Sequence, residues 1–214
     1  MNNLFKRLFT SIILLSILFI SLFYSNYLLF LSLFIVSIFS FMEFNNLNKK
    51  IWKYKIIKNL ISILTICYLI FFSFTIFELS KINDLIIFVL LICIFSDIGG
   101  YTVGKVIGGK KLTKISPNKT ISGAIGSFLF SLIPLTLFLN FSSGTYNFSL
   151  IEKIILCFFI SLICQLGDLF ISFFKRKAKV KDTGKILPGH GGILDRIDGI
   201  LFAVPFAYII FKIL

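Results

Sequence analysis

Long apolar segments run through most of this chain, and they decide what it can fold into. Hydrophobic residues fill 57% of the 214 positions, charged residues fill 14%, and the mean hydropathy is +0.99. A water-soluble domain of this length cannot bury so much apolar surface, so the bilayer must be part of the solvent. Seven segments are long enough, or nearly so, to span it: roughly 8–24, 27–44, 59–77, 85–107, 121–139, 151–172 and 199–213. The sequence therefore predicts an all-α integral membrane protein, a polytopic helical bundle of about seven transmembrane helices, forming one domain over residues 1–214.

Basic residues alternate with these segments and predict an orientation. They cluster before the first segment and in every second connection: Lys6 and Arg7, then 45–58, 105–119 and 173–198. The other connections, near 25–26, 78–84 and 140–150, hold Lys81 as their single basic residue. Cytoplasmic loops carry such an excess of Lys and Arg. We therefore expect a multi-pass protein of the plasma membrane or inner membrane with its basic loops in the cytoplasm. The net charge of +13 is explained by these loops, so we expect no nucleic-acid partner.

Acidic residues are rare, and four of the nine lie within residues 168–199 together with the single histidine. Asp195 and Asp198 share one face if the last helix opens at this point. Two carboxylates on one face suit a hard divalent cation such as Mg²⁺. Capping of a helix N-terminus is the alternative explanation for the pair. Asp168 is a third candidate ligand.

Two carboxylates fall inside predicted spans, where an ionisable group is a functional candidate by default. Asp97 and three glycines interrupt the segment 85–107, near its cytoplasmic end. Asp168 lies toward the cytoplasmic end of the segment 151–172. A solvated carboxylate at the membrane boundary is the alternative for each.

Three further motifs suit phosphate groups. The glycines of Pro188–Gly192 allow backbone N–H groups to approach an anion, although the turn has a purely structural alternative. Ser116–Thr120 precedes a predicted helix, where an anion site competes with ordinary capping by Thr120 or Ser122. The basic run Lys175–Lys181 has the alternative of facing lipid headgroups.

Taken together, these motifs resemble a known family, the phosphatidate cytidylyltransferases, also called CDP-diacylglycerol synthases. The signature matches at Ser172, Lys175, Arg176, Lys181, Asp182, Gly184, His190, Gly191, Gly192, Asp195, Arg196 and Asp198. A second block matches at Asp97–Tyr101, Gly104, Gly109, Lys110, Ser116, Pro117, Lys119 and Thr120. Glu43 resembles a further family position. The chain departs from the family at Ile171, where a Glu is usual, and at Ser122, where an acid or amide is usual.

The resemblance implies a reaction of CTP with phosphatidate at the cytoplasmic rim of the bilayer, giving CDP-diacylglycerol and pyrophosphate. It implies Mg²⁺ bound by Asp168, Asp195 and Asp198, with or without a second cation. It also implies the following roles: Lys175 and Arg196 with the three aspartates as catalytic residues, and Asp97, Ser116, Lys119, Thr120, Arg176, Lys181, His190, Gly191 and Gly192 as residues that bind the nucleotide and its phosphates. Association into a homodimer is a further expectation.

Three alternatives compete with this interpretation. A CDP-alcohol phosphatidyltransferase also uses spaced aspartates, but its D-G-x-x-A-R element is missing from the sequence. A transporter with a cation site at the interrupted segment 85–107 would place its ligands near the bilayer midplane. The third alternative is an inactive family member, because Ile171 and Ser122 depart from the family pattern.

Overall fold

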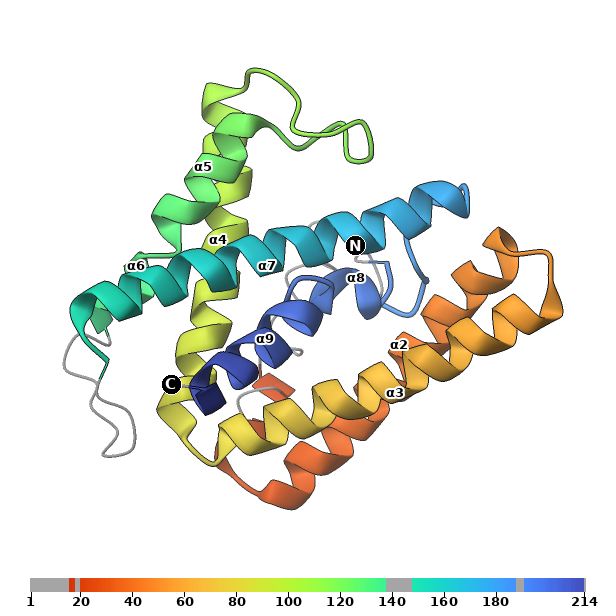
Figure 1. Ribbon diagram of the computed structural model, residues 1–214, viewed down its shortest axis with the longest axis horizontal. Coiled ribbons are helices and arrows are strands. Elements are labelled where there is room, and N and C mark those ends of the chain that lie inside the picture. Colours follow the sequence, from red (N-terminus) through yellow and green to blue (C-terminus); the bar gives the residue numbers. More distant parts are fainter. Residues whose placement is uncertain (1–15, 18–19, 138–147, 188–190, 214) are drawn as a thin grey trace, which may run out of the picture. The chain divides into compact units, whose positions relative to one another are not determined.

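The computed structural model is helical throughout the part of the chain that it describes, residues 16–17, 20–137, 148–187 and 191–213 (Figure 1). The helices in chain order are α2 (Asn26–Ile51), α3 (Lys55–Ser80), α4 (Asn83–Ile107), α5 (Ile121–Phe130), α6 (Ile133–Leu137), α7 (Leu150–Lys177), α8 (Leu194–Ile197) and α9 (Ile200–Ile213). In these ranges β-type pairing is limited to two isolated bridges, between Lys111 and Thr120 and between Leu187 and Gly191.

Four of the described helices are long and apolar enough to cross a membrane: α2, α3, α4 from Asp84 onward, and α7. Two shorter apolar helical stretches, Ile121–Thr136 and Ile200–Ile213, coincide with most of the predicted fifth and seventh segments. The predicted first segment, 8–24, falls mostly outside the described residues. The prediction of an all-α protein is confirmed for the described residues, and four of their helices could span a membrane, whereas the count of seven spans stays a prediction.

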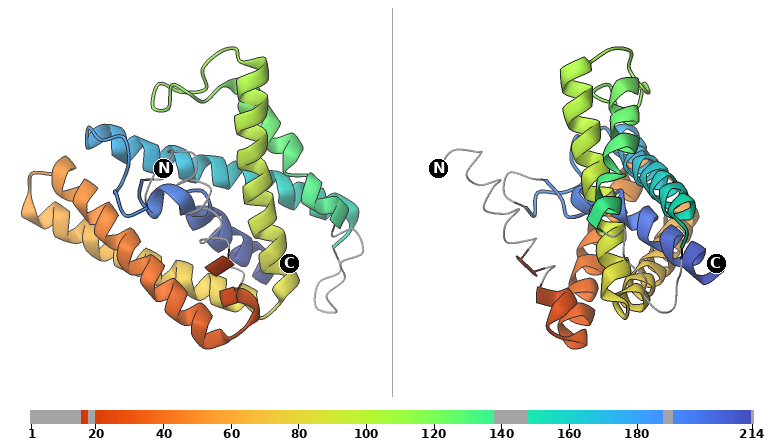
Figure 2. Two further views of the ribbon diagram at one scale, coloured as in Figure 1. Left: turned by 180° about the vertical axis from the view of Figure 1, so that it is seen from behind. Right: turned by 90° about the vertical axis from the view of Figure 1, so that its left-hand side faces the viewer.

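The predicted interruption of the segment 85–107 is wrong, because α4 continues through Asp97 and the glycines. These glycines let α5 approach closely, as small residues do between membrane helices. A Cβ atom added to Gly99 would lie 2.5 Å from the Gly126 carbonyl oxygen, and one added to Gly126 would lie 2.5 Å from Val103 Cβ. Figures 1 and 2 show α4 and α5 side by side. The glycines therefore serve packing and leave the helix unbroken.

One predicted helix is divided, and the last long helix begins after Asp198. The segment 121–139 divides into α5 and α6 at Ser131–Leu132. Pro134 explains this break, because it lacks the N–H that would continue the helical hydrogen bonding. At the other end of the chain, α8 has four residues and stops before Asp198. The expectation that Asp195 and Asp198 share a face of one helix is therefore wrong.

Gly199 lies at the break between α8 and α9 and packs closely against α7. A Cβ atom there would lie 2.5 Å from the Cys164 sulfur. The Gly199 carbonyl accepts backbone hydrogen bonds from Phe202 at 3.2 Å and Ala203 at 3.0 Å, so α9 begins anew from this residue. Asp198 consequently lies in the turn between the two helices.

The chain divides into two compact units, and each is discontinuous in sequence. One comprises Met1–Phe77 with Phe174–Ile197, and the other comprises Glu78–Phe173 with Asp198–Leu214. In the second unit, α4 packs against α5, α6 and α9. The hydroxyl groups of Ser96 in α4 and Ser161 in α7 form a buried hydrogen bond of 2.8 Å. The expectation of a single domain stays a prediction.

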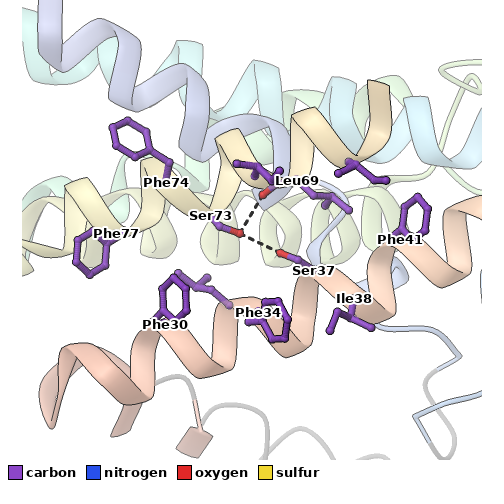
Figure 3. A pocket seen from close by; sticks show the side chains of 12 residues that line it. Phe30, Phe34, Ser37, Ile38, Phe41, Leu69, Ser73, Phe74 and Phe77 are labelled. Atoms are coloured by element: carbon purple, nitrogen blue, oxygen red, sulfur yellow. Dashed lines mark hydrogen bonds between the residues drawn. The ribbon is translucent and has the colours of Figure 1, made fainter. Parts of the chain in front are cut away.

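In the first unit, α2 and α3 form an antiparallel hairpin (Figures 1 and 2). The Asn48 amide nitrogen in α2 donates to the Lys58 carbonyl at 2.9 Å and to Ser62 Oγ at 3.1 Å. Further along, the hydroxyl groups of Ser37 and Ser73 lie 2.9 Å apart. Around this second contact the helices enclose an apolar groove of about 680 Å³ (Figure 3). Phenylalanines line much of it: Phe30, Phe34, Phe41, Phe74 and Phe77.

Replacing Gly126 by Val tests the contact between α4 and α5. The larger side chain would overlap Val103 and force the helices apart, which destabilises tightly packed interiors by roughly 1–3 kcal/mol. We expect the thermal unfolding midpoint of the detergent-purified protein to fall by several degrees. Ile125→Ala, on an exposed position of the same helix, is the control and should change the midpoint little. Equal midpoints for wild type and Gly126→Val would show that this approach is not tight.

Candidate active site

A helix-ending turn directs the signature segment away from α7. The Val180 N–H donates to the Lys175 carbonyl at 3.0 Å, and the Lys179 N–H donates to the Arg176 carbonyl at 3.1 Å. Lys179 adopts a positive φ of 55°, a left-handed conformation that usually falls to Gly at this position of a helix end. The basic run is therefore split between the last turn of α7 and the α7–α8 loop, which we define as residues 178–193.

The Asp195 carboxylate is the most heavily hydrogen-bonded acid of this first unit. Its Oδ2 accepts from the Thr183 N–H at 2.7 Å, the Thr183 hydroxyl at 2.9 Å and the Gly192 N–H at 3.1 Å. Its Oδ1 accepts from the Lys175 ammonium at 2.7 Å. These interactions join α7, the α7–α8 loop and α8. Four donors are about the full capacity of a carboxylate.

Burial and these donors act in opposite directions on Asp195. Its side chain is 5% exposed and that of Lys175 is 13% exposed. Burial alone would raise the pKa of the Asp195 carboxyl, but the Lys175 ammonium and the N–H groups of Thr183 and Gly192 outweigh it, and the pKa lies below its ordinary value. Asp195 is therefore ionised at neutral pH, with its charge balanced chiefly by Lys175.

Glycines shape the α7–α8 loop around this carboxylate. Leu187 and Gly191 pair through two backbone hydrogen bonds of 2.9 and 3.2 Å, and Gly191 has a φ of 86° that favours glycine. A Cβ atom on Gly192 would lie 2.1 Å from Thr183 Oγ1. The Gly192 N–H donates to Asp195, so in this structure that donor is occupied, and the predicted contact of Gly192 with phosphate stays a prediction. His190 lies outside the described residues, and its predicted role stays a prediction.

A second carboxylate–ammonium pair lies in the other unit. Asp168 in α7 and Lys119, which precedes α5, form an ion pair of 2.5 Å, with side chains 29% and 26% exposed. The Ser172 hydroxyl, one turn further along α7, donates to Asp168 at 3.3 Å. The Asp198 backbone lies beside Gly167, where an added Cβ atom would be 2.7 Å from the Asp198 carbonyl oxygen. The structure thus brings Lys119 to Asp168, with the Asp198 backbone against the adjoining residue.

The segment before α5 is held by its own hydrogen bonds. Thr120 is the N-cap of α5, and its hydroxyl accepts from the Gly123 N–H at 3.0 Å. The Ser122 hydroxyl, at one of the two departures from the family, donates to the Gly108 carbonyl and closes the loop. The Lys119 N–H donates to the Ser116 carbonyl at 3.1 Å. Capping, the alternative for this motif, is therefore present, and ligand binding by Ser116 and Thr120 stays a prediction.

The remaining predicted residues lie on several elements. Asp97 is exposed on α4, while Arg176, Lys181 and Arg196 are exposed at the end of α7, in the α7–α8 loop and on α8. Ile171, the other departure from the family, is 1% exposed in α7. An apolar residue at this buried position needs no hydrogen-bond partner, so the departure is compatible with the local packing.

Sequence reasoning missed Thr183. This residue is 7% exposed, and its hydroxyl and N–H both bind Asp195. It stands between Asp182 and Gly184, two positions that match the signature, and this placement is the one signal that could have pointed to it. Otherwise the sequence does not predict that a threonine in a basic loop is buried.

The predicted magnesium ligands have suitable chemistry, because carboxylate oxygens are the ligands that Mg²⁺ prefers. Asp195 and Asp168 each bind an ammonium group, so each already stabilises a positive charge. Among the described residues, however, no group of three or more His, Cys, Asp or Glu side chains is gathered closely enough to hold a metal ion. Binding of Mg²⁺ by Asp168, Asp195 and Asp198 stays a prediction.

Comparison with known proteins shows which family the chain resembles. Residues 50–214 match the model of the cytidylyltransferase family. A protein of Rickettsia bellii named phosphatidate cytidylyltransferase is 35% identical over 98% of the chain and 91% of its own length. Proteins with the same name from Bacillus subtilis and Helicobacter pylori strain J99 are 46% and 44% identical, over 53% and 55% of the chain.

The alignments cover 42% of the Bacillus relative and 43% of the Helicobacter relative, so the chain spans less than half the length of these two. Four described helices are long and apolar enough to cross a membrane, which places the chain with helical membrane proteins. More narrowly, the family match and the Rickettsia alignment cover most of the sequence. The chain belongs to the cytidylyltransferase family.

Replacing Lys175 by Met tests the ion pair with Asp195. The variant leaves a buried carboxylate without its counter-charge, a change that costs on the order of 3–5 kcal/mol when a buried pair is broken. We expect faster tryptic cleavage of the α7–α8 loop and a lower unfolding midpoint. The double variant Lys175→Met/Asp195→Asn removes both charges and should recover part of the loss. Ile186→Ala, at an exposed position of the same loop that trypsin does not recognise, is the control; an equal effect there would contradict the buried ion pair.

Proposed function

We propose that this protein transfers the cytidylyl group of CTP to phosphatidate, giving CDP-diacylglycerol and pyrophosphate for phospholipid biosynthesis. The observation that carries the proposal is the pairing of Lys175 with Asp195 and of Lys119 with Asp168, at positions that match the signature and the second block. The names of the relatives from Rickettsia, Bacillus and Helicobacter support the same reaction.

The reaction needs positive charge more than it needs a base. A phosphate oxygen of phosphatidate attacks the α-phosphorus of CTP, a new P–O bond forms, and the bond to the bridging oxygen of pyrophosphate breaks. The second pKa of a phosphate monoester is about 6, so the nucleophile is largely deprotonated near neutral pH. The difficulty is that two anions meet while negative charge builds on the leaving group. Fixed positive groups stabilise such a transition state.

The basic residues supply this charge in our proposal. Lys119, Lys175, Arg176, Lys181 and His190 bind phosphate groups, and Arg196 joins the catalytic set. A phosphate that reaches Lys119 or Lys175 draws the ammonium away from its carboxylate, because the anionic substrate competes for the same donor. The polar contacts from Asp97, Ser116, Thr120, Gly191 and Gly192 complete the proposed nucleotide site.

A divalent cation fits the carboxylates that this exchange leaves without an ammonium partner. We propose Asp168, Asp195 and Asp198 as ligands of Mg²⁺, alone or together with a second cation. When bound, Mg²⁺ supplies further positive charge toward the phosphate oxygens. The role of the chain is to present ionised carboxylates, and the low pKa of Asp195 agrees with that role.

The membrane orientation is part of the proposal. Seven spans with the N-terminus inside place the basic loops in the cytoplasm, the compartment in which CTP is found, at the plasma membrane or inner membrane. The acyl chains of phosphatidate remain in the bilayer while its phosphate reaches the cytoplasmic rim. We also propose that two copies associate.

An assay with purified protein tests the reaction. We expect CTP, phosphatidate and Mg²⁺ to give pyrophosphate and CDP-diacylglycerol in equal amounts, and EDTA to stop the reaction. Asp195→Asn and Asp198→Asn should each abolish turnover and leave the protein in the membrane, because each removes a proposed carboxylate ligand of Mg²⁺. Glu78→Gln, in an exposed pair with Lys81, is the matched control. A wild-type protein without product would support the inactive-member alternative.

Cysteine labelling tests the orientation. In a background without the four native cysteines, Lys114→Cys and Lys185→Cys should resist an impermeant thiol reagent in intact cells and react after permeabilisation. Lys81→Cys, in the opposite set of connections, should react in intact cells. All three positions are exposed, so labelling reports sidedness. Labelling of Lys114→Cys and Lys185→Cys from opposite sides would contradict the proposed topology.

A further inference from the structure

A second carboxylate is buried against the α7–α8 loop, and the proposed chemistry does not use it. Glu43, in the second half of α2, is 2% exposed. Its Oε1 accepts from the Ile193 N–H at 3.0 Å, and its Oε2 accepts from the Leu194 N–H at 2.9 Å. These N–H groups stand at the start of α8 and have no partner within that helix. Glu43 therefore caps α8 from a helix about 150 residues earlier in the chain.

The loop backbone closes around this carboxylate at two glycines. A Cβ atom on Gly184 would lie 2.4 Å from Glu43 Oε1, and one on Gly192 would lie 2.2 Å from Oε2. Real Cβ atoms do not approach oxygen so closely, so both positions require glycine while Glu43 is in place. Both glycines match the signature, which indicates that the loop is shaped to receive the carboxylate.

One hydroxyl connects Glu43 to Asp195. Thr183 Oγ1 lies 2.7 Å from Glu43 Oε2 and 2.9 Å from Asp195 Oδ2. A hydroxyl has one proton to donate, so the two carboxylates share this donor. The Thr183 N–H also binds Asp195, at 2.7 Å. A shift of Thr183 would therefore move two of the donors that hold Asp195.

We propose that Glu43 is a positioning residue: its buried carboxylate fixes the α7–α8 loop and, through the Thr183 hydroxyl, sets the orientation of the Asp195 carboxylate. Among the described residues no basic side chain forms an ion pair with Glu43, so its charge is stabilised by hydrogen bonds from the loop and α8. The site around Glu43 therefore requires a side chain of this shape with two acceptor oxygens. The consequence for turnover rests on the proposed function.

Glu43→Gln keeps the shape and removes one acceptor. In either orientation of the amide, its NH₂ group would face a backbone N–H, of Ile193 or of Leu194. We expect tryptic cleavage of the purified protein within the α7–α8 loop to quicken at least fivefold. In the assay with CTP and phosphatidate we expect kcat to fall at least tenfold and the Mg²⁺ concentration for half-maximal rate to rise. Glu78→Gln, the matched control, should change none of these values.

Thr183 variants keep the test decisive if Glu43→Gln does not fold. Thr183→Val keeps the size and removes the hydroxyl, and it should reproduce the loss in kcat and the Mg²⁺ shift. Thr183→Ser restores the hydroxyl and should recover kcat to within about threefold of wild type. If Glu43→Gln folds, its double variant with Thr183→Val should have a kcat no lower than that of the less active single variant, because both changes break one network.

Two outcomes overturn the proposal. One is cleavage of Glu43→Gln at the wild-type rate together with an unchanged Mg²⁺ requirement. The other is a wild-type kcat and Mg²⁺ requirement for Thr183→Val, which would show that the hydroxyl does not couple the two carboxylates. A wild-type protein that makes no CDP-diacylglycerol would instead overturn the proposed function, and the cleavage rates would still decide whether Glu43 holds the loop.

Discussion

A carboxylate removed from water must find donors, and much of the first unit is arranged to supply them to Asp195. An uncompensated buried charge is among the most costly features that a protein can contain. The Lys175 ammonium, the N–H and hydroxyl of Thr183 and the N–H of Gly192 meet that requirement. They come from α7, the α7–α8 loop and the residue beside α8, so the path of the loop follows from the needs of a single side chain.

Lys175 and Lys119, the partners of the two aspartates, are also suited to bind phosphate groups. Lys175 and Lys119 neutralise carboxylates in the structure, and each ammonium is a natural donor to an anionic substrate. In our proposal, these pairs keep both ammonium groups in place until an anionic substrate competes for them. The acids in the proposed site also reduce the repulsion between its clustered basic residues.

Most helices could be predicted from the sequence, because apolar runs of spanning length leave few other folds. The errors have identifiable causes. Gly99 and Gly104 suggested an interruption of α4, whereas they allow close packing against α5. Pro134 divides the predicted fifth segment, and Gly199 lies at the break between α8 and α9, packed closely against α7. Composition shows that glycine and proline are present, but their effect depends on the neighbour that each one meets.

The sequence by itself determined the membrane class, the predicted orientation and the candidate residues of the signature, because hydropathy, charge pattern and motif spacing are local properties. Only the tertiary structure decided which charges meet: Lys175 with Asp195, Lys119 with Asp168, and Glu43 with Thr183 across 140 residues. Side-chain pairs of this kind depend on how distant helices and loops pack, and no periodicity encodes them. Burial then strengthens the contacts of Asp195 and Glu43, since a hydrogen bond to a carboxylate matters most where water cannot replace it.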